Sequence, residues 1–305
     1  MKITSLFLQS LLLLPLTSFA SVEPSTFVSK NYGLQHATGL VRTKDSREFL
    51  KNSPRESFQF NVEAVPGKFS LRGKAGPVED QGMCGSCWDF SLTSVLRGSW
   101  MQQGQDPGRL SYNYLLNCAP TMAGCDGGDF SAADYLISPK GPPAYGSDGE
   151  YTESQGKCVE LPPVSSAVSY KLLGTNLGNI PNAPLPSFKD IAYAVGVLHA
   201  PVSVDVAVDT AWQNYASGVF NKCSSGEVNH MVSVEGYDCE TSVDSKGNCV
   251  FDESGNLPKG VGKWIIRNSW GTSWGDRGYI TMKATDKKGN RCSSVGLDAL
   301  YFNVK

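Results

Sequence analysis

Apolar residues follow different spacings in the two halves of this chain of 305 residues. In the first half, the apolar residues behind Phe90 recur every three or four positions, which predicts a helix that begins near Cys87. Shorter helices are predicted over 110–118, capped by Ser111, and from about 130 to 136. The first half therefore consists of helices and loops.

After a hinge near residue 161, apolar and polar residues alternate with period two, which is typical of strands. Strands are predicted over 169–173, 201–208, 230–236, 263–267 and 278–283, with one helix over 187–198. Two unlike halves predict an α+β fold with a helical half at about 73–165 and an antiparallel sheet or barrel at about 166–305. A cleft between two such halves is where ligands usually bind.

The first twenty residues have the pattern of a secretory signal peptide. Lys2 precedes an apolar run over 6–16, and Ser18-Phe19-Ala20 places small residues at the expected cleavage site. The run is too short to span a bilayer, which disfavours the alternative of a membrane anchor. We therefore expect a secreted or periplasmic protein, or one in a lysosome-like lumen.

Residues 21–62 form a polar leader in which basic side chains outnumber acidic ones. The whole chain carries a net charge of −2, so the body that follows is acidic. This contrast suggests a short propeptide that is held partly by charge and later removed. The alternative is a disordered tail. The net charge also argues against a nucleic-acid partner.

Nine cysteines in an oxidising compartment indicate four disulfides and one thiol left over. The pair Cys84 and Cys87 alone could be half a zinc site, a redox pair, or one disulfide leg beside an unrelated thiol. A nucleophilic thiol needs a base. Of the three histidines, His36 lies in the leader, His199 lies between a helix end and a strand, and His230 is the best candidate.

Three motifs in order carry a resemblance to a known family. They are Cys84-Gly-Ser-Cys87-Trp, the pair Asn229-His230, and Asn268-Ser-Trp-Gly-Thr-Ser-Trp-Gly275. Together they resemble the papain-like cysteine proteases, from about Val65 to the C-terminus. The resemblance implies a two-domain fold with a helical left domain, an antiparallel β-barrel right domain and the active-site cleft between them.

The family's roles carry over to matching positions. The resemblance implies that Cys87 is the nucleophile and that His230 pairs with it as thiolate and imidazolium. Asn268 would orient the imidazole, and Trp270 would shield the His–Asn hydrogen bond from water. Gln81, together with the backbone N–H of Cys87, would bind the oxyanion.

The resemblance also implies a substrate-binding cleft. Gly127 and Gly128 would let a substrate backbone approach and pair in extended form. Asp205 stands in the wall of the pocket that receives the second side chain before the scissile bond, so we expect basic or polar side chains there. Alternatively, Asp205 faces away and other residues, including Ala299, form the pocket. The expected substrate-binding set is Gly127, Gly128, Phe130, Asp205, Val228, Asn229, Met231 and Trp270.

The family's disulfides would join Cys84 with Cys125, Cys118 with Cys158 and Cys223 with Cys292. Cys239 and Cys249 would then close a local loop within an insertion at 239–262, which leaves Cys87 free. This pairing disfavours a zinc site or a redox pair at Cys84 and Cys87. We expect no metal and no cofactor.

These expectations describe a papain-like peptidase domain over 63–305, made as a zymogen with its own propeptide as inhibitor. It would act as a monomeric, secreted cysteine endopeptidase on proteins or peptides, through a thioester intermediate. The alternatives are a non-catalytic binding or scaffold protein, and a transpeptidase or ligase that uses the same thioester. Asp89 departs from the family pattern, since a carboxylate on a buried helix needs partners.

Overall fold

The computed structural model describes residues 35–58, 61, 63–174, 185–224 and 226–304. The expected signal peptide lies outside the described residues, as do residues 21–34, 59, 60 and 62 of the expected propeptide. Among the residues described, no helix is both long and apolar enough to cross a membrane.

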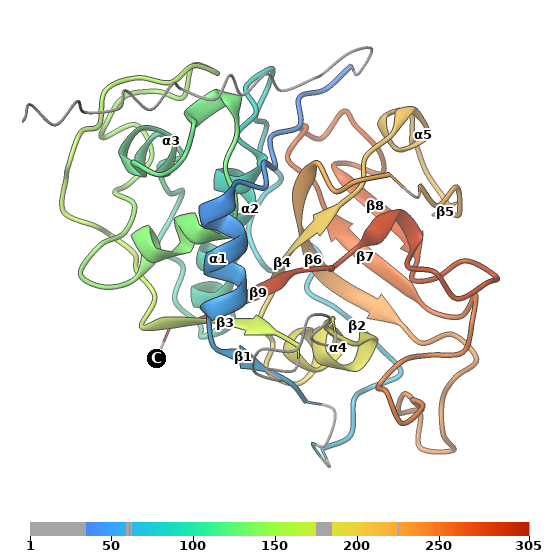
Figure 1. The fold of residues 1–305 in the computed structure, drawn as a ribbon. Helices are drawn as coiled ribbons and strands as arrows, with labels where there is room; N and C mark the ends of the chain where they lie inside the picture. Colours follow the sequence, from blue (N-terminus) through green and yellow to red (C-terminus); the bar gives the residue numbers. More distant parts are fainter. Residues whose placement is uncertain (1–34, 59–60, 62, 175–184, 225, 305) are drawn as a thin grey trace, which may run out of the picture.

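Helices gather toward the first half of the sequence and strands toward the second (Figure 1). The α-helices are α1 (Lys44–Asn52), α2 (Cys87–Gln102), α3 (Asn113–Cys118), α4 (Phe188–Gly196) and α5 (Thr210–Gln213), and the 3-10 helices are η1 (Gly124–Asp126), η2 (Phe130–Leu136) and η3 (Cys292–Ser294). The strands are β1 (Arg55–Glu56), β2 (Lys68–Ser70), β3 (Ser169–Leu173), β4 (Val202–Val206), β5 (Val219–Phe220), β6 (His230–Asp238), β7 (Lys263–Arg267), β8 (Tyr279–Lys283) and β9 (Ala299–Asn303).

The predicted elements are present, but several are shorter than their apolar patterns. The helix predicted over 110–118 begins at Asn113, because the Ser111 hydroxyl bonds the Asp148 carboxylate and accepts from the Asn113 N–H. The helix predicted at 130–136 is a 3-10 helix. Helix α4 is capped by Ser187, whose side chain accepts from the Asp190 N–H while Asp190 accepts from the Ser187 N–H.

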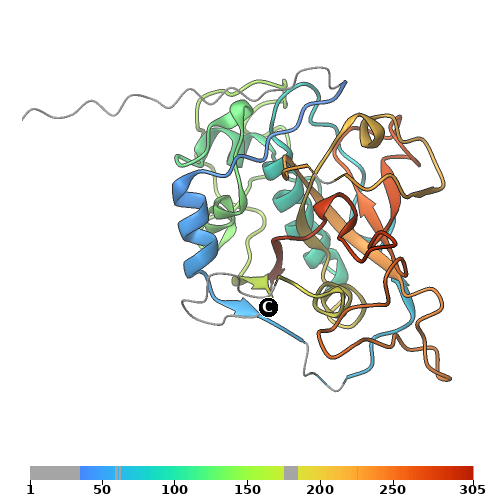
Figure 2. The same cartoon turned by 45° about the vertical axis from the view of Figure 1, so that its right-hand side comes forward.

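Helix α2 is the central helix and lies between the helical half and the sheet (Figure 2). Most of its residues are buried, so its surface carries no single apolar stripe. The Ser91 hydroxyl donates to the Val232 carbonyl oxygen at 2.9 Å and lies 2.7 Å from the Ser203 hydroxyl, which joins α2 to strands β6 and β4. These bonds fix the position of the helix along the sheet.

The strands form one sheet in the order β1-β3-β9-β4-β6-β7-β8-β5, with β2 paired to β6. The α+β class is confirmed, but the expected closed barrel is not: among the described residues the sheet is open. Its central pairs are antiparallel, whereas β1–β3 and β5–β8 at its two ends are parallel. Both end strands are two residues long, so each offers few backbone groups for pairing across the gap.

The sheet buries polar residues that a period-two pattern would place outside. Strand β4 is buried throughout, and β6 is buried from His230 to Tyr237, because other elements cover both faces. Several of these polar residues find partners within the fold, whereas the Ser233 and Tyr237 hydroxyls have no hydrogen-bond partner among the described residues. Arg267 Nε lies 2.8 Å from Glu235 Oε1, and the Tyr279 hydroxyl donates to Glu235 Oε2 at 2.9 Å. Such a pair is tolerated because both charges are compensated.

The insertion at 239–262 is built on a repeated turn. Asp244-Ser-Lys-Gly-Asn248 and Asp252-Glu-Ser-Gly-Asn256 share it with Asp286-Lys-Lys-Gly-Asn290 outside the insertion. In each turn one aspartate oxygen accepts from the N–H groups two and four residues later, and the glycine has φ of +81°, +77° or +92°. These aspartates shape turns, because their oxygens are bonded to the backbone of their own loops.

Four disulfides cross-link the chain in the pairing that the resemblance implied. They are Cys84–Cys125, Cys118–Cys158, Cys223–Cys292 and Cys239–Cys249.

The described part of the leader is docked on the body, which argues against a disordered tail. An extended segment, drawn in blue, passes over the seam between the two halves and continues into helix α1 (Figures 1 and 2). Thr43 caps α1 by accepting from the Ser46 N–H, and β1 then adds to the edge of β3. The sequence did not predict α1, because only Ser46 and Leu50 of its nine residues are buried.

We expect that Ser187→Ala removes the bond that the Ser187 hydroxyl accepts from the Asp190 N–H and lowers the free energy of unfolding by about 1 kcal/mol. The measurement is the urea midpoint of the uncut chain with its disulfides intact. Ser245→Ala is the matched control, since Ser245 is exposed in a turn. Equal midpoints for the two variants would contradict the role given to the cap.

Candidate active site

Cys87 is the first residue of helix α2 and is fully buried. All nine cysteines lie within the described residues, and Cys87 alone is outside a disulfide. Ser86 precedes the helix without a side-chain cap, so backbone N–H groups at the helix start remain available to a negative charge. The thiol lies within hydrogen-bonding reach of backbone groups of Met231 and of Gly39 in the leader.

His230 opens strand β6, and Asn268 follows strand β7, which pairs with β6. His230 Nε2 lies 2.8 Å from Asn268 Oδ1, and both side chains are buried. The Ser269 N–H also donates to this oxygen at 2.9 Å, which fixes the amide orientation. The other ring nitrogen, Nδ1, has no hydrogen-bond partner among the described residues, so it is free to exchange a proton with a nucleophile.

Trp270 covers this pair on one side. Its ring centroid lies 4.8 Å from that of His230, and the side chain is 1% exposed. Trp274 packs edge-on against Trp270 at 5.1 Å and donates its indole N–H to the Gln213 carbonyl oxygen. Trp270 therefore covers one side of the hydrogen bond between His230 and Asn268, and Trp274 supports the Trp270 ring from the core.

Gln81 is buried and held in one orientation. Its Oε1 accepts from the Ser269 hydroxyl at 2.6 Å, and its Nε2 donates to the carbonyl oxygens of Cys84 at 2.9 Å and Ala37 at 3.2 Å. Ala37 belongs to the leader, so a leader carbonyl lies on the amide expected to bind the oxyanion. The orienting role of Ser269 was not predicted from the sequence, although this residue stands within the Asn268-Ser-Trp motif.

The leader runs through the cleft as an extended strand. The Gly128 N–H donates to the Gly39 carbonyl oxygen at 2.9 Å, and the Val41 N–H donates to the Gly128 carbonyl oxygen at 3.0 Å. The Leu40 N–H donates to the Asn229 carbonyl oxygen at 3.0 Å. A Cβ on Gly39 would lie 1.8 Å from the Gly85 carbonyl oxygen, so only glycine fits there.

The leader is also clamped beside Trp270. The His36 N–H donates to Gln213 Oε1 at 2.8 Å, and Gln213 Nε2 donates to the His36 carbonyl oxygen at 3.1 Å. The His36 ring stacks on Trp270 with centroids 4.7 Å apart. No sequence pattern indicated Gln213, which lies in the short helix α5 far from the motifs.

Asp205 faces the leader within the cleft and does not point away from it. Arg42 Nη2 lies 2.5 Å from Asp205 Oδ2 and 2.6 Å from Asp298 Oδ2. The guanidinium carbon lies 5.8 Å from the centroid of the Phe130 ring. Asp298 was absent from the expected set. Of the other expected pocket residues, Met231 is paired with Asp205 across β4 and β6, Ala299 is paired with Val204 across β9 and β4, and Val228 lines the cavity beside Arg42.

Burial beneath the leader shifts the two reacting groups toward their neutral forms. Burial raises the pKa of Cys87 to about 12, against nearby backbone hydrogen bonds that lower it. Burial lowers the pKa of His230 to about 4, and the hydrogen bond to Asn268 opposes this shift only in part. The leader-covered form therefore holds a thiol and a neutral imidazole at pH 7. The thiolate–imidazolium pair stays a prediction for the trimmed enzyme.

Asp89 lies two residues after Cys87 and is fully buried. The Thr93 hydroxyl donates to Asp89 Oδ1 at 2.9 Å, while Oδ2 has no hydrogen-bond partner among the described residues. Burial raises the pKa of Asp89 well above its usual range, against the hydrogen bond from Thr93 that lowers it, so the fold favours the neutral form of this carboxyl. A neutral acid needs fewer partners, which explains how the helix accommodates it.

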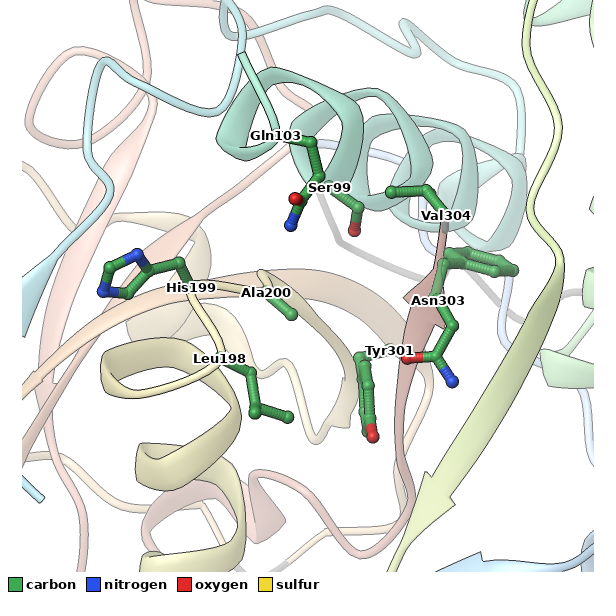
Figure 3. Close-up of a pocket in the computed structure, with 9 residues that line it drawn as sticks. Ser99, Gln103, Leu198, His199, Ala200, Tyr301, Asn303 and Val304 are labelled. Carbon is green, nitrogen blue, oxygen red and sulfur yellow. The ribbon is translucent and has the colours of Figure 1, made fainter. Parts of the chain in front are cut away.

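A separate cavity lies away from the residues described above. It has a volume of about 190 Å³ between the end of α2, the α4–β4 connection and β9 (Figure 3). His199 lies at its rim and stacks on Phe69, but no cysteine or carboxylate lines the cavity. Within the described ranges, no group of three or more His, Cys, Asp or Glu residues could hold a metal ion.

Comparisons with known proteins agree with this geometry. A family model described as papain family cysteine protease matches residues 65–298. Cysteine proteinase 2 of Dictyostelium discoideum is 31% identical over 302 residues, which cover 91% of this chain and 76% of the relative.

Two solved structures are similar as well. The bromelain protease from Ananas comosus in complex with the E64 inhibitor has a TM-score of 0.60 at 28% identity, covering 79% of this chain and 100% of that one. Digestive procathepsin L 3 of Tenebrio molitor larval midgut has a TM-score of 0.62 at 27% identity, covering 86% and 79%. The chain therefore belongs to the papain family of cysteine proteases.

Proposed function

We propose that this protease is an endopeptidase in which Cys87 and His230 perform the chemistry and residues 35–58 keep it inactive until they are removed. One observation carries the assignment of roles. The single free thiol stands at the start of α2, and the imidazole of His230 is held by Asn268 with its second nitrogen unpaired. No other cysteine of the described chain is available as a nucleophile.

The reaction follows from this arrangement. The Cys87 sulfur attacks the carbonyl carbon of a peptide bond, and the thiol proton passes to His230. The carbonyl oxygen becomes an oxyanion that accepts from Gln81 Nε2 and the Cys87 N–H. His230 then gives its proton to the leaving amine as the C–N bond breaks, which leaves a thioester on Cys87.

Water completes the reaction. His230 takes a proton from a water molecule, whose oxygen attacks the thioester carbon. The C–S bond breaks, the proton returns to the sulfur, and the carboxylic acid product leaves. Asn268 keeps the imidazole in one orientation through both steps, and Trp270 excludes water from their hydrogen bond.

The leader inhibits by occupying the groups that a substrate needs. The Ala37 carbonyl lies on Gln81, and the backbone of residues 39–41 pairs with Gly128. The signal-peptide pattern of residues 1–20 and the four disulfides support activity outside the cytoplasm. We further propose that the substrates are proteins and peptides and that the enzyme is a monomer.

We expect Gln81→Ala to lower kcat about 100-fold or more, because the oxyanion loses one preorganised donor. The measurement is peptide hydrolysis by the trimmed enzyme, normalised to the number of active sites that react with an epoxysuccinyl reagent. Gln105→Ala is the control, since Gln105 is exposed beyond α2. A kcat equal to that of the control would contradict the role of Gln81.

We expect Cys87 to react with iodoacetamide at pH 8 roughly 100-fold faster in the trimmed enzyme than in the intact 21–305 chain. A raised pKa leaves almost no thiolate below pH 12 in the covered form, and trimming removes the burial that raises it. Mass spectrometry locates the adduct and confirms that the chain is intact. Equal rates in the two forms would show that the leader does not cover the thiol.

The hold of the leader should weaken in acid. Burial and the charge of Asp298 raise the pKa of Asp205 to about 7, and Arg42 of the leader opposes this rise, so leader binding releases protons. Arg291 also acts on this group by its charge, but it belongs to the body and stays in place. Burial lowers the pKa of His36 in the complex, which adds a shift of the same sign.

We therefore expect the inhibition constant of a 21–62 peptide for trimmed enzyme to be higher at pH 5 than at pH 8. Arg42→Ala in the peptide should weaken inhibition at pH 8 and reduce the pH dependence, whereas Lys51→Ala, at an exposed position of α1, should do neither. Tighter inhibition at pH 5 would contradict the charge argument.

A further inference from the structure

The cleft contains a pocket whose floor carries two carboxylates. Asp205 comes from strand β4 and is completely buried, while Asp298 directly precedes β9 and has a side chain that is 14% exposed. The Asp298 N–H donates to Asp205 Oδ1 at 3.0 Å, and the Gly296 N–H donates to the Asp205 carbonyl oxygen at 2.9 Å. These bonds lie within the enzyme body, so the two acids stay side by side without the leader.

Both cations that pair with these acids belong to the leader. Arg42 Nη2 contacts both carboxylates, and Arg55 Nη2 lies 3.1 Å from Asp298 Oδ1. Over the residues that the structure describes, no basic side chain of the body forms an ion pair with either acid. Removal of the leader takes away both positive charges and leaves the two negative ones.

Arg291 does not replace the lost cations. It is buried near Asp205, but its guanidinium donates to the backbone carbonyl oxygens of Pro186, Val295 and Gly296. Two neighbouring carboxylates, one of them fully buried in the leader-bound structure, are therefore left without an ion-pair partner. Such a pair favours either a bound proton or an incoming cation.

The walls of the pocket suit a long basic side chain. The Phe130 ring is fully buried and presents its face toward the guanidinium of Arg42, as in a cation–π contact. An open cavity of about 600 Å³ adjoins Arg42 and gives access from solvent. Its lining on the enzyme side consists of Glu227, Val228, Asn229 and Leu297.

We propose that, in the trimmed enzyme, Asp205 and Asp298 together bind a basic side chain of the substrate at the place that Arg42 occupies. Arginine is preferred over lysine. A single nitrogen of Arg42 bridges both acids, which an ammonium can also do, but the planar guanidinium can in addition stack on the face of Phe130. The substrate residue is the second before the scissile bond, as expected for this pocket, and the inference rests on the proposed function.

The test compares four peptides that differ only at that residue, which is Arg, Lys, citrulline or Leu. Citrulline has the shape of arginine without its charge. With wild-type trimmed enzyme we expect kcat/KM to be about 10- to 100-fold higher for Arg than for citrulline, with Lys between them, because hydrogen bonds to charged groups contribute about 1.5–3 kcal/mol.

Asp205→Asn and Asp298→Asn should each reduce the Arg-to-citrulline ratio about tenfold. The ratio is taken within each variant, so that any general loss of cleavage cancels. An asparagine at 205 can still accept from the Asp298 N–H, so the backbone contact is kept. Glu150→Gln, at an exposed position, is the matched control and should leave the ratio unchanged.

Equal rates for Arg and citrulline in the wild-type enzyme would overturn the inference, as would an unchanged ratio in both variants. If Asp205→Asn does not fold, Asp298→Asn and the wild-type peptide series still decide. Cleavage of the Leu peptide without an Arg preference would refute this inference and leave the proposed function standing. Failure to cleave any peptide, with no epoxysuccinyl adduct on Cys87, would refute both.

Discussion

The packing of helix α2 on strand β6 is the contact on which the whole site depends. Ser91 lies one helical turn after Cys87, and its hydroxyl binds the backbone of Val232, two residues after His230. A buried polar group left without its partner costs about 1–3 kcal/mol, so the helix cannot slide along the strand without loss. This bond sets the position of the thiol relative to the imidazole, although neither reacting group takes part in it.

In the proposed function, the leader uses the same burial to keep the site inactive. A catalytic pair of this kind works through its charged forms, and these are the forms that a water-free environment disfavours. By covering Cys87 and His230, the leader blocks the approach of a substrate and also removes the charge separation that gives the sulfur its nucleophilicity. The leader therefore blocks the cleft sterically and also disfavours the charged forms of the two reacting groups. Both effects end when the leader is removed.

Apolar periodicity, a local signal, allowed prediction of the fold class. The resemblance to the papain-like proteases implied three of the disulfides and a candidate residue for each catalytic role, and the two cysteines that remained implied the fourth disulfide. The sequence did not reveal Ser269, Gln213 or Asp298, whose roles depend on what lies opposite them in space. That the sheet stays open could not be predicted either, because the two-residue end strands leave almost no periodic pattern. Asp89 departed from the expected pattern, and its burial raises the pKa of its carboxyl and so favours the neutral form.

The leader passes Gly85 with a residue that has no side chain. Any larger residue at position 39 would lift the strand from the cleft and break its pairing with Gly128 on one side and Asn229 on the other. The fit of the leader in the cleft thus depends on the absence of a side chain at position 39. A synthetic inhibitor based on this segment can vary the side chains that enter pockets, but it needs a glycine where the chain passes Cys87.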